Sequence, residues 1–359
     1  MQDLLSVPCW FLGTNAPKGY YSRFDKIFCV KSDGKVFLLK GGPGTGKSTM
    51  LKKIASVLAE KGLSTELVFC SADTDSLDAV ITSDGKFAFA DATLPHAYEP
   101  KYPGTSEIPV SLWDCWDEKK LWKEKEEIIR LFDENRRLHE EARRYISAAS
   151  GLLDQAAKLG LDSVFPEKVE KTAKRICMRE FGRKNSQRGT EKQRFLSAIT
   201  DKGIFFHKNT PKILCDKIYL IDDDAGAVSR IFMSTVRKYA LEHGLDIITC
   251  TCPIFPQEKI EHIFIPALRL GFMTDNRRHK IDIVPYRIIH ARRFADFKKY
   301  SANKIKIRFA LRSAKNLIDQ AVNCTKEAKL VHNELEKIYI NATDFKKVDE
   351  KFEKIIKSI

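Results

Sequence analysis

Nine consecutive residues, 41–49, have the types and spacing of a phosphate-binding loop. The stretch Gly-Gly-Pro-Gly-Thr-Gly-Lys-Ser-Thr fits the pattern G-x-x-x-x-G-K-[S/T], and it lies between an apolar strand and an amphipathic helix. Glycines allow the backbone to curl so that successive N–H groups point at phosphates, and the helix N-terminus favours an anion. Mg-ATP is the expected ligand, with Lys47 at the β- and γ-phosphates and the Ser48 hydroxyl on the metal. The residues expected to bind the nucleotide are Gly41, Gly42, Pro43, Gly44, Thr45, Gly46, Lys47, Ser48 and Thr49.

An aspartate at the end of another apolar strand is the expected partner of Ser48 in holding magnesium. A P-loop needs such an acidic side chain, and Phe87-Ala-Phe-Ala-Asp91 has the required form. Asp91 is therefore predicted to be a metal ligand. Both Asp91 and Lys47 are predicted to be catalytic residues. The alternative is a turn cap, because Thr93 and Pro95 follow. The residue after Asp91 is not the glutamate that activates water in motor-type ATPases, so slow hydrolysis is expected.

Three further carboxylates, Asp73, Asp75 and Asp78, follow the strand expected at 66–70. Strand C-terminal ends line the ligand crevice of open α/β sheets, so these side chains could orient an acceptor hydroxyl, hold Mg²⁺ through water or activate an attacking group. Asp73 and Asp75 are the additional catalytic candidates. An Asx-turn followed by a helix cap would explain the same residues equally well. His96 is either a sensor of the γ-phosphate or a structural histidine.

The second half of the chain repeats the first half at a nearly constant offset. Small, ordered changes of offset over about 85 residues indicate a tandem duplication. We therefore expect a nucleotide-binding unit over residues 1–182 and a second unit over 193–359. The matches, at shifts of 182 to 184 residues, pair Phe11-Leu12 with Phe195-Leu196, Lys18-Gly19 with Lys202-Gly203, 35–39 with 217–221, and 60–63 with 242–245.

Strands and helices alternate in each unit, which predicts an α/β fold with two tandem P-loop-type parallel-sheet units. A long helical segment is expected after each sheet. In the second unit an a/d heptad seam of mostly small residues runs from Ala310 to Ile338 and predicts a closely packed helix. The long helices form hairpins with the shorter helices expected at 166–180 and 344–357, or they pair between the units.

The loop of the second unit has lost the residues that bind phosphate. Aligned by the repeat, Ser229 stands in place of Lys47, and the aspartates at 222–224 would repel a triphosphate. The second unit is therefore expected to be a degenerate pseudo-domain. If the units pack about a two-fold axis, an arginine of the second unit could reach the first site as an arginine finger. The candidates are Arg230, Arg277 and Arg278, and the alternative is a basic surface that serves another partner.

The net charge of +14 lies entirely in the second half of the 359 residues. Residues 1–180 hold 27 basic and 27 acidic side chains, whereas residues 181–359 hold 35 and 21. This basic half, and 269–315 in particular, could face an acidic partner or nucleic acid. The composition is that of a globular protein. We expect a cytoplasmic location and no membrane partner, because no apolar run approaches a membrane span and the N-terminus lacks the pattern of a signal peptide.

Four segments together resemble a bacterial family of tandem-repeat P-loop proteins described as ATP-binding or ATPase-like. They are 18–21, 40–49, 70–78 and 91–96, and the resemblance extends, more weakly, through the second half. The resemblance implies a P-loop fold, ATP binding and a cytoplasmic setting. Unlike members with a complete loop in both halves, this chain retains only the first.

The leading hypothesis is a nucleotide-dependent switch or slow ATPase with one Mg-ATP site. The main alternative is a kinase for a nucleotide or small metabolite, in which Asp73, Asp75 or Asp78 binds the acceptor. The P-loop alone cannot separate the two, because both reactions use the same phosphate cradle. A third possibility is a nucleic-acid-binding protein that ATP regulates.

Overall fold

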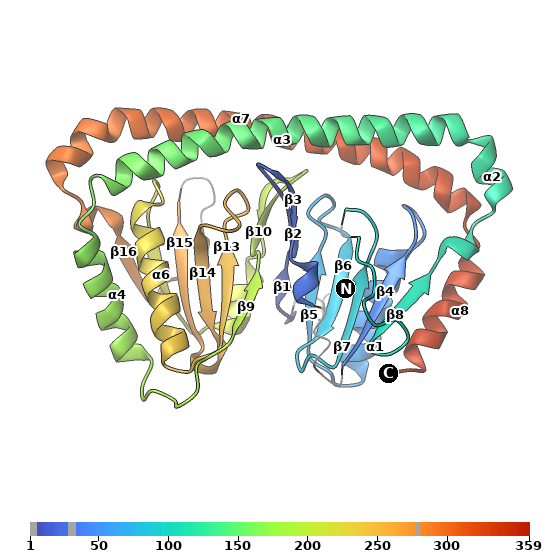
Figure 1. Ribbon diagram of the computed structural model, residues 1–359, viewed down its shortest axis with the longest axis horizontal. Helices are drawn as coiled ribbons and strands as arrows, with labels where there is room; N and C mark the ends of the chain where they lie inside the picture. Colours follow the sequence, from blue (N-terminus) through green and yellow to red (C-terminus); the bar gives the residue numbers. More distant parts are fainter. Residues whose placement is uncertain (1–5, 28–33, 96, 277–280) are drawn as a thin grey trace.

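Two α/β units lie side by side under a pair of long helices in the computed structural model (Figure 1). The structure describes residues 6–27, 34–95, 97–276 and 281–359. The helices α3 (Lys125–Leu161) and α7 (Phe297–Ala342) pack along each other and span both units. The first unit lies at the right in Figure 1 and the second at the left.

Each unit is built on a six-stranded sheet, and the two sheets have the same strand order. The first runs β1-β5-β6-β7-β4-β8 and the second runs β9-β13-β14-β15-β12-β16. The first sheet comprises β1 (Cys9–Trp10), β4 (Lys35–Lys40), β5 (Thr65–Phe69), β6 (Leu77–Thr82), β7 (Phe87–Asp91) and β8 (Glu107–Ser111). The second comprises β9 (Glu191–Arg194), β12 (Lys217–Asp222), β13 (Ile247–Thr251), β14 (Ile260–Ile265), β15 (Leu270–Asp275) and β16 (Arg287–His290).

Both sheets are mostly parallel, but each contains one antiparallel strand that the sequence pattern did not predict. β6 runs antiparallel to β5 and β7, and β14 runs antiparallel to β13 and β15. The predicted α/β fold with two parallel-sheet units is confirmed, and one antiparallel strand in each sheet is a feature that the prediction did not include. The reason is local: the aspartate-rich segment after β5 makes a short turn and returns as a strand, which needs no crossover helix.

Among the described residues, one face of the first sheet packs against α-helices and the other is covered by segments outside them. Phe37 and Leu39 of β4 pack in a core with α1 (Lys47–Glu60), while Val36 and Leu38 face the opposite side. That opposite side is covered by irregular segments that contribute Phe24 and the partly buried Tyr98. Since both faces are buried, β4 is a continuous apolar run, as expected for a central strand.

The two units exchange helices through α3 and α7. After α3, α4 (Pro166–Glu180) packs against α6 (Ala227–Glu242) of the second unit. After α7, α8 (Phe345–Ile356) returns to the first unit, where Val348 and Ile355 join the core beside α1. The described residues also form the short α-helices α2 (Glu118–Lys123) and α5 (Asn209–Leu214). The long helices thus pair between the units, which was one of the two arrangements expected.

Equivalent hairpins meet where the units touch. They are β2 (Gly13–Ala16) with β3 (Gly19–Ser22), and β10 (Ser197–Thr200) with β11 (Gly203–Phe206). Beside them Phe11 and Phe195 exchange backbone hydrogen bonds of 2.9 and 3.0 Å. Pairing of matching positions is what a local two-fold axis produces.

Candidate nucleotide site

Residues 41–46 form the connection between β4 and α1, and they have the backbone shape of a phosphate cradle. Gly44 and Gly46 have φ angles of 66° and 81°, a region that side chains with a Cβ rarely adopt. Gly46 immediately precedes the first turn of α1, and no side chain caps that turn. The uncapped N–H groups and the helix dipole can therefore bind an anion at this end of α1.

Lys47 and Asp91 are brought together by neighbouring parallel strands. β4 pairs with β7, where Leu39 is opposite Asp91. The Lys47 ammonium lies 3.6 Å from a carboxylate oxygen of Asp91 and donates to the carbonyl oxygens of Gly41 and Gly42, both at 2.7 Å. The lysine is thus folded back onto its own loop and must leave these carbonyls to reach a phosphate.

Ser48 and Asp91 are the two residues that the sequence analysis assigned to magnesium as oxygen ligands. The Ser48 hydroxyl accepts a hydrogen bond of 2.9 Å from the backbone N–H of Leu77, and Asp91 accepts one of 2.9 Å from that of Thr93. Hydroxyl and carboxylate oxygens suit Mg²⁺, which usually takes its other ligands from phosphate and water. The residues present therefore fit a magnesium–nucleotide complex. In the loop itself Thr45 is buried and donates to Gly42, while Thr49 is exposed on α1.

Asp73 and Asp75 lie in the turn between β5 and β6, where lysines of the second half bind them. Lys329 on α7 lies 2.8 Å from Asp73 and also contacts Asp201, at 3.3 Å. Lys202 donates to both carboxylate oxygens of Asp75 at 2.9 Å. These two aspartates therefore connect the units through ion pairs.

Asp78 lies on β6 rather than in a turn or helix cap. It is only 5% exposed. Burial raises the pKa of the Tyr20 hydroxyl well above its usual value, and the nearby charges of Asp78 and Asp91 raise it further. Tyr20 on β3 is thus within electrostatic reach of both carboxylates, and the sequence analysis assigned it no role. Its only sequence signal was its position in the recurring Lys-Gly turn segment.

The C-terminal part of α7 lies directly on the phosphate-binding loop. A Cβ added at Gly44 would lie 2.6 Å from the carbonyl oxygen of Glu336, and one at Gly42 would lie 3.4 Å from the Tyr339 ring. Hydrogen bonding to His332 lowers the pKa of Glu336, and hydrogen bonding to the backbone N–H of Gly44 lowers it further. The Glu336 carboxylate therefore lies close to a loop N–H that is expected to face phosphate. Sequence spacing could not reveal this contact, because nearly 300 residues separate the partners.

In the second unit a built-in carboxylate stands where phosphate would bind. Asp223, which is 4% exposed, accepts hydrogen bonds from the backbone N–H groups of Gly226 at 3.0 Å and Ser229 at 2.7 Å. The connection is also two residues shorter, 223–226 against 41–46. The strands β4 and β12 and the last residues of α1 and α6 all keep the offset of 182, so Ser229 stands at the position of Lys47 and α6 begins two residues earlier than α1.

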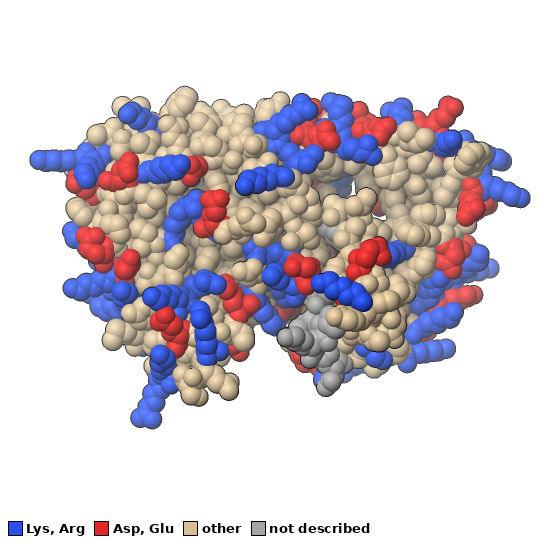
Figure 2. All heavy atoms as spheres, viewed as in Figure 1, with Lys and Arg blue, Asp and Glu red and all other residues tan. Residues whose placement is uncertain are grey.

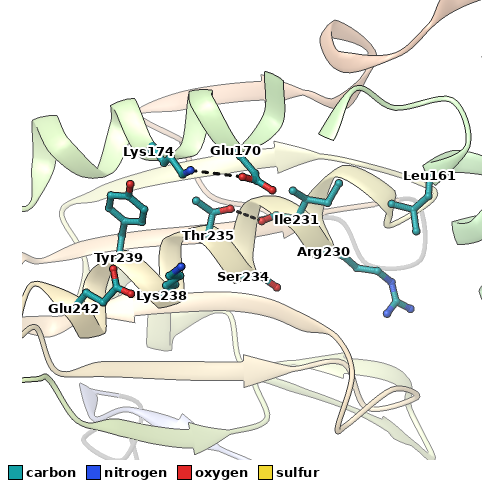
Figure 3. A pocket seen from close by; sticks show the side chains of 10 residues that line it. All are labelled: Leu161, Glu170, Lys174, Arg230, Ile231, Ser234, Thr235, Lys238, Tyr239 and Glu242. Carbon is teal, nitrogen blue, oxygen red and sulfur yellow. Dashed lines mark hydrogen bonds and ion pairs between the residues drawn. The ribbon is translucent and has the colours of Figure 1, made fainter. Parts of the chain in front are cut away.

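Of the three arginine candidates, Arg230 is the one that lies among the described residues. The Arg230 guanidinium lies over the Phe255 ring, 5.2 Å from its centroid. Arg277 and Arg278 lie outside the described residues, as does His96. Figure 3 shows Arg230 at one end of a groove along α4 and α6, with its guanidinium turned away from Lys174 and Tyr239. This groove, of about 580 Å³, is lined by no residue of the 41–49 loop.

Comparison with known proteins identifies a protein family. The model of the KAP family P-loop domain matches residues 18–359, which is nearly the whole chain. No curated protein and no solved structure matches. The match supports a nucleotide-binding P-loop NTPase in general terms. Among the helices of the described residues, none has the length and apolar composition needed to cross a membrane.

Proposed function

The chain belongs to the KAP family of P-loop domains, and from this we propose that it is an ATP-dependent switch with slow hydrolysis. Mg-ATP binds at the single loop over residues 41–49 of the nucleotide-binding unit, 1–182. The second unit, 193–359, is a degenerate copy that responds to the occupancy of that loop. One observation carries the proposal: α7, a helix of the second unit, rests on the loop with Glu336 at the Gly44 N–H.

Binding of a triphosphate must change the contact between α7 and the loop. Backbone N–H groups of the loop and of the first turn of α1 bind the phosphates, and Lys47 moves from the carbonyls of Gly41 and Gly42 to the nucleotide. Bound magnesium, held by Ser48 and Asp91, would neutralise part of the phosphate charge. Glu336 then faces another anion, and near a protein surface two unit charges about 4 Å apart repel each other by roughly 4 kcal/mol. This repulsion favours a position of α7 in which Glu336 is away from Gly44.

The same helix can relay such a movement to the second unit. α7 is 46 residues long, which corresponds to about 69 Å of continuous helix. Its other end adjoins the basic segment that includes Arg292 and Arg293. A rigid helix with one end on the loop is the kind of two-state element that a switch requires.

Slow hydrolysis follows from the surroundings of Asp91. The next residue, Ala92, is buried and has no acid–base chemistry. Asp73 and Asp75 are ion-paired with Lys329 and Lys202, so they are poorly placed to activate water. The same pairs weigh against the kinase alternative, in which these carboxylates would hold an acceptor.

A fluorescent ATP analogue titrated with magnesium tests the switch. We expect Glu336→Gln to tighten binding by about fivefold to tenfold, because about 1 kcal/mol of anion competition is removed. Glu334→Gln, an exposed change on the same helix, is the matched control and should leave the affinity unchanged. Equal affinities of the Glu336→Gln variant and the wild type would remove the central argument for the proposal.

The loop assignment and the reaction need their own measurements. Lys47→Ala should abolish detectable binding, whereas Lys61→Ala, at the far end of α1, should not. Mass spectrometry of the protein with ATP and a pool of acceptors should find ADP and phosphate forming slowly and no phosphorylated acceptor. A phosphorylated acceptor would instead establish the kinase alternative.

A further inference from the structure

The first part of α7 carries positive charge and no negative charge. Between Asp296, whose side chain caps the helix, and Asp319 there are seven basic residues and no acidic residue. Figure 2 shows Lys and Arg side chains extending from the left end of the molecule, where α7 begins. The seven are Lys298, Lys299, Lys304, Lys306, Arg308, Arg312 and Lys315.

Large apolar side chains are exposed on the same stretch of helix. Phe297 and Ile305 are each 80% exposed and Phe309 is 59% exposed, whereas Ile307 and Ala310 on the opposite face are buried. Burying one such side chain completely is worth about as much as a tenfold or larger gain in affinity. We define Phe297, Ile305 and Phe309, together with the seven basic residues, as the basic apolar face.

The segment that leads into α7 has the same character. Val284 is 94% exposed and Ile288 on β16 is 43% exposed. Arg287, Arg292 and Arg293 are exposed beside them in the chain. Exposed aliphatic groups among cations thus extend from residue 284 into the first turns of α7.

The partner that fits this chemistry must offer both anions and an apolar layer. Nucleic acid offers phosphates to Lys and Arg, but it uses aromatic side chains for stacking and gives the aliphatic Ile305 and Val284 little to bind. The surface of a bilayer with anionic headgroups offers both, because an interfacial helix buries its apolar side chains at the acyl boundary while Lys and Arg reach the headgroups. The expectation of no membrane partner rested on the lack of a spanning segment and did not consider contact with a membrane surface. We propose that the basic apolar face binds the surface of a membrane that contains anionic lipid.

Vesicle co-sedimentation of the full chain tests the proposal. The protein should sediment with vesicles of phosphatidylglycerol and phosphatidylcholine, and much less with vesicles of phosphatidylcholine alone. Added salt should weaken the association, because it screens the cations. Absence of sedimentation with the anionic vesicles would overturn the proposal.

Substitutions separate this face from the rest of the basic surface. Phe297→Ser, Ile305→Ser and Phe309→Ser combined should lower vesicle partitioning by about tenfold or more, since three apolar anchors are lost. Lys306→Gln with Arg308→Gln and Arg312→Gln should weaken binding to anionic vesicles in particular. Leu330→Ser is the matched control: this residue is 65% exposed on the same helix but lies outside the face. All these positions are exposed, and circular dichroism with thermal melting checks that each variant folds.

The results that would contradict the membrane proposal can be distinguished from a failure of the proposed nucleotide switch. Unchanged partitioning of the triple serine variant would overturn the proposal even if the wild type bound vesicles. Tight, salt-dependent binding of single- or double-stranded oligonucleotides without vesicle binding would assign the face to nucleic acid instead. Neither result depends on ATP, because the vesicle experiment is performed without nucleotide.

Discussion

At the scale of single residues, His207 is a side chain whose protonation opposes folding. Its ring lies between Phe11 and Phe69, with centroids 4.4 and 5.0 Å away, at the contact between the two units. The side chain is buried, and its Nε2 atom has no hydrogen-bond partner. Burial lowers the pKa of His207 to about 3. The folded protein therefore keeps this imidazole neutral in conditions where an unfolded chain would protonate it.

The resulting prediction concerns stability in mild acid. An unfolded histidine titrates near pH 6.5, so between about pH 6.5 and 3 the unfolded state binds one more proton than the folded state. The free energy of unfolding should fall by about 2 kcal/mol between pH 7 and 5 from this residue alone. Urea unfolding of His207→Leu at both pH values should lack that increment. His290→Gln, a change at an exposed histidine, should retain it, and an identical decrease in the His207→Leu variant would contradict the assignment.

The sequence predicted the local geometry of the first site but not its long-range neighbours. The loop pattern and the apolar run ending at Asp91 were sufficient to predict this local geometry, because each pattern depends only on a strand and the residues beside it. The proximity of Lys47 and Asp91 follows from the adjacency of β4 and β7. Glu336 and Tyr20 were not found, because packing between distant segments brings them to the site and no local pattern encodes that packing.

At the scale of elements, the segment between β5 and β6 agrees with one expectation from the sequence and differs from another. The sequence indicated that Asp73 and Asp75 lie at the end of a strand, which they do. It also allowed a turn followed by a helix cap, whereas the chain continues as β6. Alternation is hard to recognise in Leu77–Thr82, because every residue of that strand is buried. A strand covered on both faces and a helix segment look alike over so few residues.

A second prediction concerns the ion pairs that tie this turn to α7 and to the turn between β10 and β11. Burial alone would lower the pKa of Lys329, but the carboxylates of Asp73 and Asp201 raise this pKa above its usual value. Lys329→Ala leaves these partly buried carboxylates without a cation, and we expect a loss of about 2 kcal/mol in the free energy of unfolding. Chemical denaturation measures it. Lys326→Ala, an exposed change one turn away, should stay within about 0.5 kcal/mol of the wild type.

A double-mutant cycle shows whether the loss comes from these pairs. Asp73→Asn combined with Lys329→Ala removes one of the opposing carboxylates, so the two effects should not add. Additive effects would mean that Lys329 stabilises the helix in another way. In that case the ion pair between Asp73 and Lys329 would contribute little to the free energy of unfolding.

At the scale of the whole molecule, the exchange of α4 and α8 makes the two sheets depend on each other. The division into residues 1–182 and 193–359 follows the sequence repeat, whereas each core takes a helix from the other segment. The first core includes Val348 and Ile355 of α8, and the second includes Val169 and Ile176 of α4. The boundaries of the sequence repeat therefore differ from the boundaries of the two hydrophobic cores.

The third prediction tests this dependence by dividing the chain. A fragment of residues 1–182 retains the complete 41–49 loop, but it lacks α8 and leaves the apolar face of α4 without its partner α6. A Cβ at Gly46 would lie 3.6 Å from the Phe345 ring, so the loop itself also loses a neighbour. We expect the isolated fragment to unfold without cooperativity, to bind a hydrophobic dye and to show no measurable affinity for an ATP analogue. Co-expression with residues 183–359 should restore binding, because the missing helix is then supplied in trans.

If the isolated fragment unfolds cooperatively and binds the analogue as tightly as the full chain, the exchanged helices are dispensable. The nucleotide site would then be a property of the first unit alone, and a relay through α7 would have no structural basis.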